Sequence, residues 1–271
     1  MAESTRHSDD PLATALARAS DVLAAAPAGL LTDFDGTVSP IVADPAASLL
    51  TGGAADSLRA LAGRLAVVAI VTGRAPLDAR RMTGVPELLI AGNHGTEWLE
   101  PGADAPIASP EAAHVRARIA LVLAAVPALD GVLIEDKGMS ATVHYRNAAD
   151  PDAARAAVVA ALPPLGDQLE LRPGRMSLEL RPVGLGDKGA ATDAIIDRFG
   201  LAGVVVMGDD ITDLDMFAAV AERRALGRLR GLIIGVGGEA GDTPPEVARA
   251  ADIVLRDPSV AAALLVGLAD A

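Results

Sequence analysis

The chain has 271 residues, with 23 Lys plus Arg against 36 Asp plus Glu, and it contains no cysteine. Its net charge of −13 argues against nucleic acids and anionic membranes as partners, because both require clustered cations. The lack of cysteine excludes disulfides, thiol catalysis and cysteine-ligated zinc. No apolar run reaches the roughly 18 residues of a membrane-spanning helix, and the polar N-terminus is unlike a secretory signal, so we expect a cytoplasmic protein.

Lysine is rare in this sequence. It occurs only at Lys137 and Lys188, against 21 arginines. Because arginine cannot replace lysine where a compact, strongly hydrated ammonium is needed, both lysines are candidate functional residues.

The first 105 residues alternate between helical and strand patterns. Short, continuous apolar runs are typical of strands that are buried on both faces of a parallel sheet. The patterns predict helices over 11–26 and 52–64, and strands over 29–33, 66–71 and 87–91.

Residues 106–184 have a different pattern. We predict helices over 110–126 and 151–162, with hairpins around Gly138 (strands 132–137 and 139–146) and around Pro173-Gly174 (strands 168–172 and 175–181). Apolar and polar residues alternate in these strands, which predicts an antiparallel sheet with one covered and one solvent-exposed face. The exposed face is predicted to carry Glu135, Lys137, His144, Arg146, Glu179 and Arg181.

From residue 185 the chain returns to the first pattern. Asp257-Pro258 is a good N-cap and first-turn pair for a closing helix. Before this closing helix, we predict helices over 189–199 and 212–225 and strands over 204–207, 232–235 and 253–255.

The fold class is therefore α/β, with a Rossmann-like parallel core of residues 1–105 and 185–271 and an inserted helix–hairpin–helix–hairpin module at 106–184.

Two carboxylates follow the first predicted strand, in the run Asp33-Phe34-Asp35-Gly36-Thr37. In an open parallel sheet the active crevice lies at the carboxyl ends of the strands. One carboxylate there could attack phosphorus while the other handles a proton, and Gly36 allows a sharp turn close to a phosphate.

A second acidic run, Gly208-Asp209-Asp210-Ile211-Thr212-Asp213, also follows a buried strand. Clustered carboxylates repel one another, so a cation is the natural remedy. Mg²⁺ prefers one or two carboxylates plus water and phosphate oxygens, and Asp33 with Asp209 would provide them.

Two more residues suit a phosphate site. Thr72 follows the 66–71 strand and precedes Gly73-Arg74, and its hydroxyl could hold a phosphoryl oxygen. Lys188 lies at the start of a predicted helix, where a cation is electrostatically unfavourable, so it is more plausibly there to neutralise a phosphoryl group.

Taken in order, these four motifs resemble those of the haloacid dehalogenase-like (HAD) phosphohydrolases. The resemblance to the trehalose-6-phosphate phosphatases covers most of the chain, and the inserted module matches the αββαββ (C2B-type) cap of that branch in layout. It is carried by DFDGTVSPIVADP, VAIVTGR, AGNHGTE, EDKGMSATVHYR, SLELRP and GDDITDLDMF.

The resemblance implies a role for each core residue. Asp33 would be the nucleophile and Asp35 the general acid and base. Mg²⁺ would be held by Asp33, the Asp35 backbone carbonyl and Asp209. Asp210 and Asp213 would act indirectly, through water and bonds to the ligands, whereas Thr72 and Lys188 would bind the phosphoryl group. Substrate binding is assigned to Arg74, Asn93, His94, Glu135, Lys137, Arg146 and Glu179.

The expected function is therefore Mg²⁺-dependent hydrolysis of trehalose 6-phosphate by a monomer. One alternative is the same chemistry on another sugar or cyclitol phosphate, such as glucosylglycerol phosphate. Another is an inactive sugar-phosphate sensor. The motif order argues against a phosphorylated receiver module, and the missing GxxxxGK[ST] motif argues against a kinase. For the charged strand face, the alternative to sugar binding is a set of solvated salt bridges.

Overall fold

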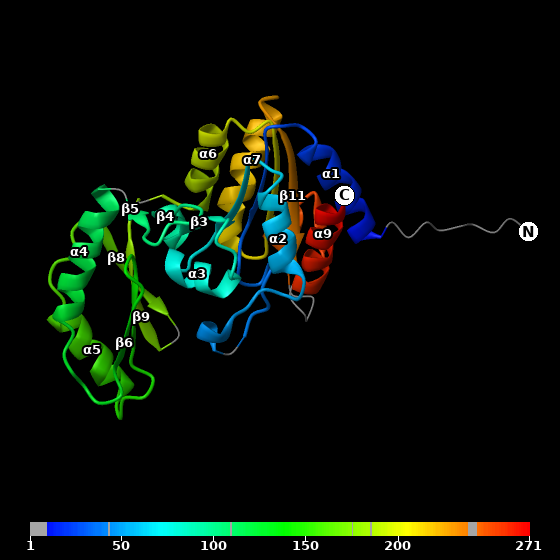
Figure 1. The fold of residues 1–271 in the computed structure, drawn as a ribbon. Helices are drawn as coiled ribbons and strands as arrows, with labels where there is room; N and C mark the ends of the chain where they lie inside the picture. The colour runs from blue at the N-terminus through cyan, green and yellow to red at the C-terminus, as the bar shows by residue number, and fades with distance from the viewer. Residues whose placement is uncertain (1–9, 43, 109, 175, 185, 238–242) are drawn as a thin grey trace, which may run out of the picture. The chain divides into compact units, whose positions relative to one another are not determined.

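The computed structural model describes residues 10–271 except for 43, 109, 175, 185 and 238–242. The chain divides into two compact units: unit 1 is Met1–Pro106 with Asp187–Ala271, and unit 2 is Ile107–Gly186 (Figure 1). These limits differ by one or two residues from those that the sequence predicts. Across the described part of the chain, none of the helices combines the length and apolar character needed to cross a membrane.

Unit 1 is built on a sheet whose strands lie in the order β12-β11-β10-β1-β2-β3-β4. Every pairing is parallel except that of β3 with β4. All residues of β1, β2 and β10 are buried, which agrees with the continuous apolar runs of the sequence. The strands are β1 (Ala28–Thr32), β2 (Val67–Val71), β3 (Leu89–Gly92), β4 (Glu97–Leu99), β10 (Gly203–Gly208), β11 (Arg230–Val236) and β12 (Ile253–Leu255).

Helices cover both faces of this sheet (Figure 1). Successive strand residues point to opposite faces, so that Leu30 packs in one hydrophobic cluster and Leu31 in the other. The first cluster includes α1 (Pro11–Leu23), α2 (Ala54–Ala62), α3 (Pro76–Thr83) and α9 (Pro258–Asp270), and the second includes α6 (Lys188–Phe199), α7 (Leu214–Ala225) and α8 (Pro245–Ala250). Short 3₁₀ helices are η1 (Pro45–Ala47), η2 (Asn93–Gly95) and η3 (Ile211–Asp213).

The strand order reverses direction between β1 and β10. These two strands pair in parallel although they lie far apart in sequence, and the chain continues outward from β1 to β2 and from β10 to β11. Ligands of open α/β sheets bind outside the carboxyl ends of the strands at such a switch point. The residues that follow β1, β2 and β10 are Asp33, Thr72 and Asp209.

Unit 2 contains an antiparallel sheet in the order β6-β7-β9-β8. Residues of α4 and α5 pack against one face of this sheet, where Val143, Leu178 and Leu180 are buried. After a short strand, β5 (Ile107–Ala108), the elements are α4 (Pro110–Ala124), β6 (Leu133–Asp136), β7 (Ala141–His144), α5 (Pro151–Ala161), β8 (Leu169–Gly174) and β9 (Ser177–Pro182).

The second hairpin of unit 2 turns later than the sequence predicts. Instead of forming the turn, Pro173 pairs with Leu178 and Gly174 pairs with Ser177. A proline is tolerated there because β8 is an edge strand, where one side of the backbone needs no partner. Met176, predicted as a strand residue, lies in the turn with a positive φ of 60°, and the predicted strand residue Arg175 lies outside the described residues.

Three further elements, α3, β4 and α8, are not predicted by the sequence pattern. The sequence of α3 is PLDARRMT, which is mostly polar. Its buried face, which includes Ala79 and Met82, is too short to give a recognisable apolar period. The elements β4 and α8 are only three and six residues long, which is too short for a periodic pattern to be read.

The closing helix α9 begins as predicted, with Asp257 as N-cap and Pro258 in the first turn. The Asp257 Oδ1 atom accepts hydrogen bonds from the backbone N–H groups of Ser259 (2.9 Å) and Val260 (3.1 Å). The hydrogen bond from Ser259 and the ion pair with Arg256 lower the pKa of Asp257 from 3.8 to about 2.

We predict that Asp257→Ala lowers the free energy of unfolding by about 1 kcal/mol, because two N–H groups of α9 lose their acceptor. Urea denaturation at neutral pH measures this change. Since the folded-state pKa is depressed, the contribution of the charge is complete above the ordinary value of 3.8 and is lost as the pH falls toward 2. The control, Asp257→Asn, retains a capping oxygen, and a loss as large as that of Asp257→Ala would contradict the capping role.

Candidate active site

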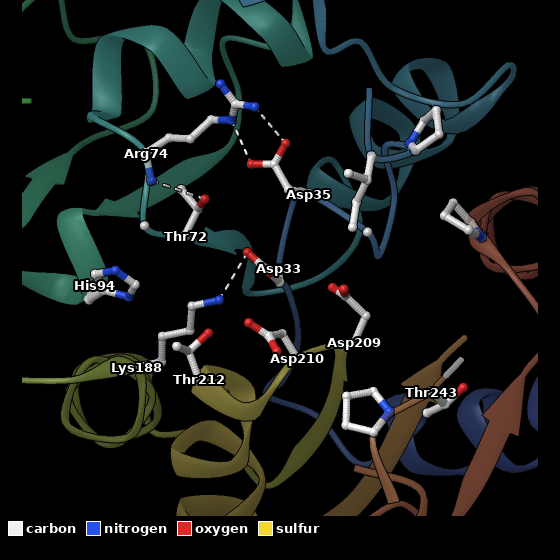
Figure 2. A pocket seen from close by; sticks show the side chains of 16 residues that line it. Asp33, Asp35, Thr72, Arg74, His94, Lys188, Asp209, Asp210, Thr212 and Thr243 are labelled. Carbon is white, nitrogen blue, oxygen red and sulfur yellow. Dashed lines mark hydrogen bonds and ion pairs between the residues drawn. The ribbon is translucent and has the colours of Figure 1, made fainter. Parts of the chain in front are cut away.

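A cavity of about 680 Å³ opens at the switch point of unit 1 (Figure 2). It brings together most of the core residues that the sequence singles out. Those lining it are Asp33, Asp35, Thr72, Arg74, His94, Lys188, Asp209 and Asp210, together with residues that sequence reasoning missed: Pro40, Ile41, Thr212, Thr243, Pro244 and Pro258.

Lys188 lies at the centre of this site although its side chain is only 2% exposed. Its Nζ atom is 3.0 Å from Asp33 Oδ1 and 2.6 Å from Asp213 Oδ1. Burial opposes the charged ammonium, but the charges of Asp33 and Asp213 outweigh it and raise the pKa of Lys188. The two carboxylates therefore hold a buried cation at the N-terminus of α6, where the helix dipole alone would repel it.

The carboxylate of Asp213 is fully buried and both of its oxygens have partners. Oδ1 accepts from Lys188, and Oδ2 accepts from the backbone N–H groups of Asp209 (2.9 Å) and Asp210 (3.1 Å). Asp213 therefore positions Lys188 and the start of the acidic loop. At Asp33, burial raises the pKa well above 3.8, against the opposing charge of Lys188.

The approach of Asp209 to the first acidic run explains the glycine at position 36. A Cβ atom there would lie 2.0 Å from Asp209 Oδ2, and Gly36 has a φ of +77°, which favours glycine. The Thr37 hydroxyl donates to Asp209 Oδ1 at 2.7 Å. Burial raises the pKa of Asp209 to about 7, partly opposed by this hydrogen bond.

The acidic groups fit a divalent cation. Single carboxylate oxygens of Asp33, Asp209 and Asp213 lie within 4.8 Å of one another. Lys188 is the ion-pair partner of Asp33 and Asp213, and its single ammonium does not balance three carboxylates when all of them are ionised. Because both oxygens of Asp213 are already bonded, Asp33 and Asp209 are the better candidates for metal ligands, and carboxylate oxygens suit a hard cation such as Mg²⁺.

Arg74 forms hydrogen bonds with both Asp35 and Thr72. The Arg74 guanidinium donates to both carboxylate oxygens of Asp35, from Nε to Oδ2 and from Nη2 to Oδ1, each at 2.6 Å. The backbone N–H of Arg74 donates to the Thr72 hydroxyl at 3.3 Å. Arg74, which follows β2, thus orients the carboxylate of Asp35, to which the family resemblance assigns proton transfer.

The loop after β3 contributes His94 to the cavity. Asn93 and His94 both have positive φ angles, 48° and 58°, and the His94 N–H donates to the Thr72 carbonyl at 2.9 Å. The Asn93 side chain instead donates to buried Glu97. Of the two residues assigned to substrate binding in this loop, the cavity lining therefore includes His94 but not Asn93.

In unit 2 the charged residues share a face of the sheet. The strand register places Glu135 opposite Thr142, Thr142 opposite Glu179, and Glu179 opposite Arg172. Lys137 Nζ is 3.5 Å from Glu135 Oε2, and Glu179 pairs with Arg181 at 2.5 Å. Arg146 follows β7 and is exposed. Sequence reasoning missed Arg172 because only the register places it beside Glu179.

Comparison with known proteins supports a family assignment. A family model described as trehalose-phosphatase matches residues 31–236. The trehalose-phosphate phosphatase of Mycobacterium avium (strain 104) is 37% identical over 217 residues, which cover 76% of this chain and 54% of that protein. An uncharacterised glycosyl hydrolase of Mycobacterium tuberculosis (strain H37Rv) is 40% identical over 203 residues, covering 69% of this chain and 15% of that protein.

Solved structures share the fold. A trehalose-6-phosphate phosphatase from Aspergillus fumigatus aligns with a TM-score of 0.61 at 25% identity, over 94% of this chain and 97% of that chain. A haloacid dehalogenase-like hydrolase from Bacteroides thetaiotaomicron aligns with a TM-score of 0.59 at 14% identity, over 87% of this chain and 97% of that chain. The α/β core is therefore the HAD fold.

The chain spans about half the length of the curated phosphatase relative and a smaller part of the glycosyl hydrolase. The matched segment of 206 residues runs from the end of β1 to the end of β11, and so includes both acidic runs, Thr72, Lys188 and the whole of unit 2. The chain therefore belongs to the trehalose-phosphatase family.

Proposed function

We propose that this chain is a Mg²⁺-dependent phosphatase that hydrolyses trehalose 6-phosphate to trehalose and phosphate. The observation that carries the proposal is the contact of Lys188 with Asp33 at the switch point of the sheet. Asp33 lies only two residues before Asp35, the second carboxylate of the first acidic run. The family assignment and the name of the Mycobacterium avium relative support the choice of substrate.

In the first step, a carboxylate oxygen of Asp33 attacks phosphorus and the bond from phosphorus to the sugar oxygen breaks. The departing electron pair goes to that oxygen, which takes a proton from Asp35. Lys188 and Thr72 bind phosphoryl oxygens: the ammonium of Lys188 neutralises their charge, and the hydroxyl of Thr72 orients them. Positioning and charge neutralisation of this kind dominate phosphoryl transfer.

In the second step, water attacks the phosphorus of the aspartyl phosphate. The aspartyl P–O bond breaks, its electron pair returns to the Asp33 carboxylate, and a proton of the water passes to Asp35. Asp33 and Asp209, with the backbone carbonyl of Asp35, would hold Mg²⁺, which when bound neutralises charge on the transferring phosphoryl group. Asp210 and Asp213 support this arrangement indirectly.

Recognition of the sugar is assigned to unit 2, acting as the cap, and to His94. Sugar hydroxyls are bound by charged and polar side chains that offer both donors and acceptors. The unit 2 sheet carries Glu135 and Glu179 on one face, Lys137 pairs with Glu135, and Arg146 is exposed just after β7, so acceptors and donors are both present, which supports a polyhydroxy substrate.

The central prediction concerns substrate and metal. We expect phosphate release from trehalose 6-phosphate with Mg²⁺, its loss with EDTA, and its recovery when Mg²⁺ is added in excess, because the acidic cluster then regains its cation. Glucose 6-phosphate, glucosylglycerol phosphate and p-nitrophenyl phosphate should be slower. A phosphate-release assay with these four esters makes the comparison.

Each other outcome contradicts a defined part of the proposal. Fast release from another ester alone would retain the chemistry of unit 1 but assign a different substrate. Release from none of the four would favour the inactive sugar-phosphate sensor. Release that is unchanged by EDTA would rule out the metal.

A second prediction tests unit 2. We expect Lys137→Ala and Glu179→Gln each to lower kcat/KM for trehalose 6-phosphate by about 10- to 100-fold, the range for losing a hydrogen bond to a charged group. The rate with p-nitrophenyl phosphate should stay unchanged, since that ester lacks the sugar. Arg155→Gln on α5 is the matched control. Equal losses on both esters, or wild-type rates on both, would argue that this face holds solvated salt bridges only.

A further inference from the structure

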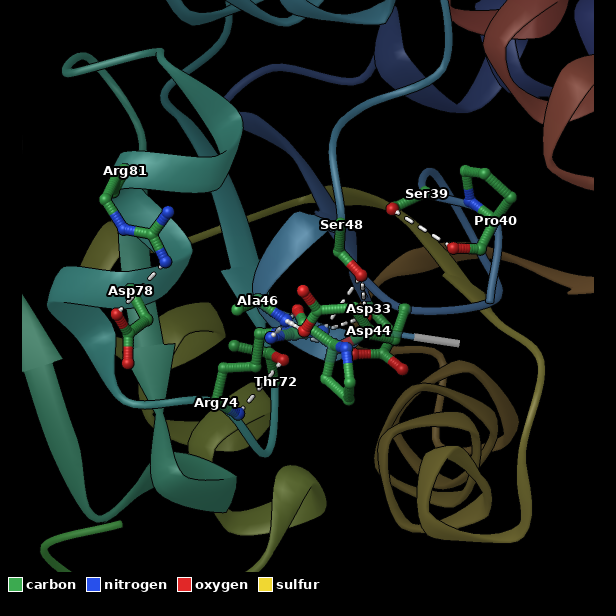
Figure 3. A network of polar contacts seen from close by, with 12 residues as sticks. Asp33, Ser39, Pro40, Asp44, Ala46, Ser48, Thr72, Arg74, Asp78 and Arg81 are labelled. Atoms are coloured by element: carbon green, nitrogen blue, oxygen red, sulfur yellow. Dashed lines mark hydrogen bonds and ion pairs between the residues drawn. The ribbon is translucent and has the colours of Figure 1, made fainter. Parts of the chain in front are cut away.

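Asp35 is part of a closed polar network that reaches a segment without any assigned role, the segment of Asp44 and Ser48 (Figure 3). Its Oδ1 atom accepts from Arg74 Nη2 at 2.6 Å and from the Ser48 hydroxyl at 3.3 Å. Arg74 Nη2 also lies 3.0 Å from Ser48 Oγ. The Ser48 side chain thus contacts both partners of the ion pair, and Ser48 is only 1% exposed.

The guanidinium of Arg74 is anchored independently of Asp35. Its Nη1 donates to the Pro45 carbonyl at 2.8 Å, and its central carbon lies 5.6 Å from the centroid of the Phe34 ring. Pro45 opens η1, whose N-cap Asp44 accepts from the Ala46 N–H at 3.0 Å. The segment 44–48 therefore supplies two fixed acceptors for Arg74, the Pro45 carbonyl and the Ser48 hydroxyl.

This anchoring matters for proton transfer. To give a proton to the sugar oxygen, one carboxylate oxygen of Asp35 must turn from Arg74 toward the substrate. If Oδ1 turns away, Nη2 still has Ser48 and Nη1 still has Pro45, so the guanidinium stays in place and Nε continues to hold Oδ2. Asp35 would then rotate about a fixed contact rather than move freely.

We propose that Arg74 and Ser48 are positioning residues for Asp35, with Ser48 holding Arg74 in place. This inference rests on the proposed function, since it assigns a role within the same phosphoryl transfer. It replaces the substrate contact that the sequence assigns to Arg74, because Nε, Nη1 and Nη2 each have a partner inside unit 1.

The test compares two esters with the purified full chain. The constant kcat/KM reports the steps up to departure of the alcohol. A sugar oxygen needs the proton of Asp35 in order to leave, whereas p-nitrophenolate leaves without one. We expect Arg74→Gln to lower kcat/KM for trehalose 6-phosphate by about 100-fold and Ser48→Ala by about fivefold, with KM unchanged and little change for p-nitrophenyl phosphate.

The matched control is Ser57→Ala, which removes another buried serine hydroxyl, one that donates to the Gly53 carbonyl at 2.9 Å. It should leave the ratio of kcat/KM between the two esters unchanged. That ratio does not depend on the fraction of folded enzyme, so partial misfolding of a variant cannot imitate the effect.

Two results would overturn the inference. An unchanged ratio in both Arg74→Gln and Ser48→Ala would show that neither residue acts through proton transfer. A higher KM for trehalose 6-phosphate at constant kcat in Arg74→Gln would show that Arg74 binds substrate. Failure of the proposed function is a separate outcome, because the wild-type chain itself would then not turn over trehalose 6-phosphate.

Discussion

The buried contact of Lys188 with Asp33 and Asp213 is the interaction on which the site depends. It joins the ends of β1 and η3 to the first residue of α6. Removing one partner of a buried ion pair lowers the free energy of unfolding by about 3–5 kcal/mol, because the remaining charge is left buried without an opposite charge. The cluster therefore couples the fold of unit 1 to the position of Asp33, the proposed nucleophile, and a longer, planar arginine would not reproduce an ammonium bonded to two carboxylates.

The rest of the site follows from packing several carboxylates around one cation. Gly36 lets Asp209 approach the first acidic run, and Thr37 and the N–H groups of the acidic loop supply hydrogen bonds in place of further cations. Asp35 has a cationic partner of its own outside this cluster, Arg74. Two carboxylates only two residues apart are thereby placed in different environments, as the proposed division between attack and proton transfer requires.

Much of the fold and of the core site was predictable from sequence because it depends on local signals. Continuous apolar runs marked β1, β2 and β10, and their shared edge brings Asp33, Thr72 and Asp209 together. The scarcity of lysine pointed to Lys188 before any motif was considered.

What the sequence did not predict depends on tertiary contacts. The late turn of the β8–β9 hairpin follows from the edge position of β8, which no local pattern reveals. Ser48 lies in the unremarkable run PAASLL, and only its contact with Arg74, 26 residues away, links it to the site. Arg172 joins the charged face of unit 2 through strand register alone.

The most direct test of the account is to identify the phosphorylated residue. Enzyme quenched in acid during turnover of trehalose 6-phosphate and then reduced with borohydride should carry homoserine in place of Asp33, since borohydride reduces an aspartyl phosphate to the alcohol. Mass spectrometry of the peptides locates the change, and Asp33→Asn should show none and lack activity. Homoserine at another aspartate, or full activity of Asp33→Asn, would contradict Asp33 as the nucleophile.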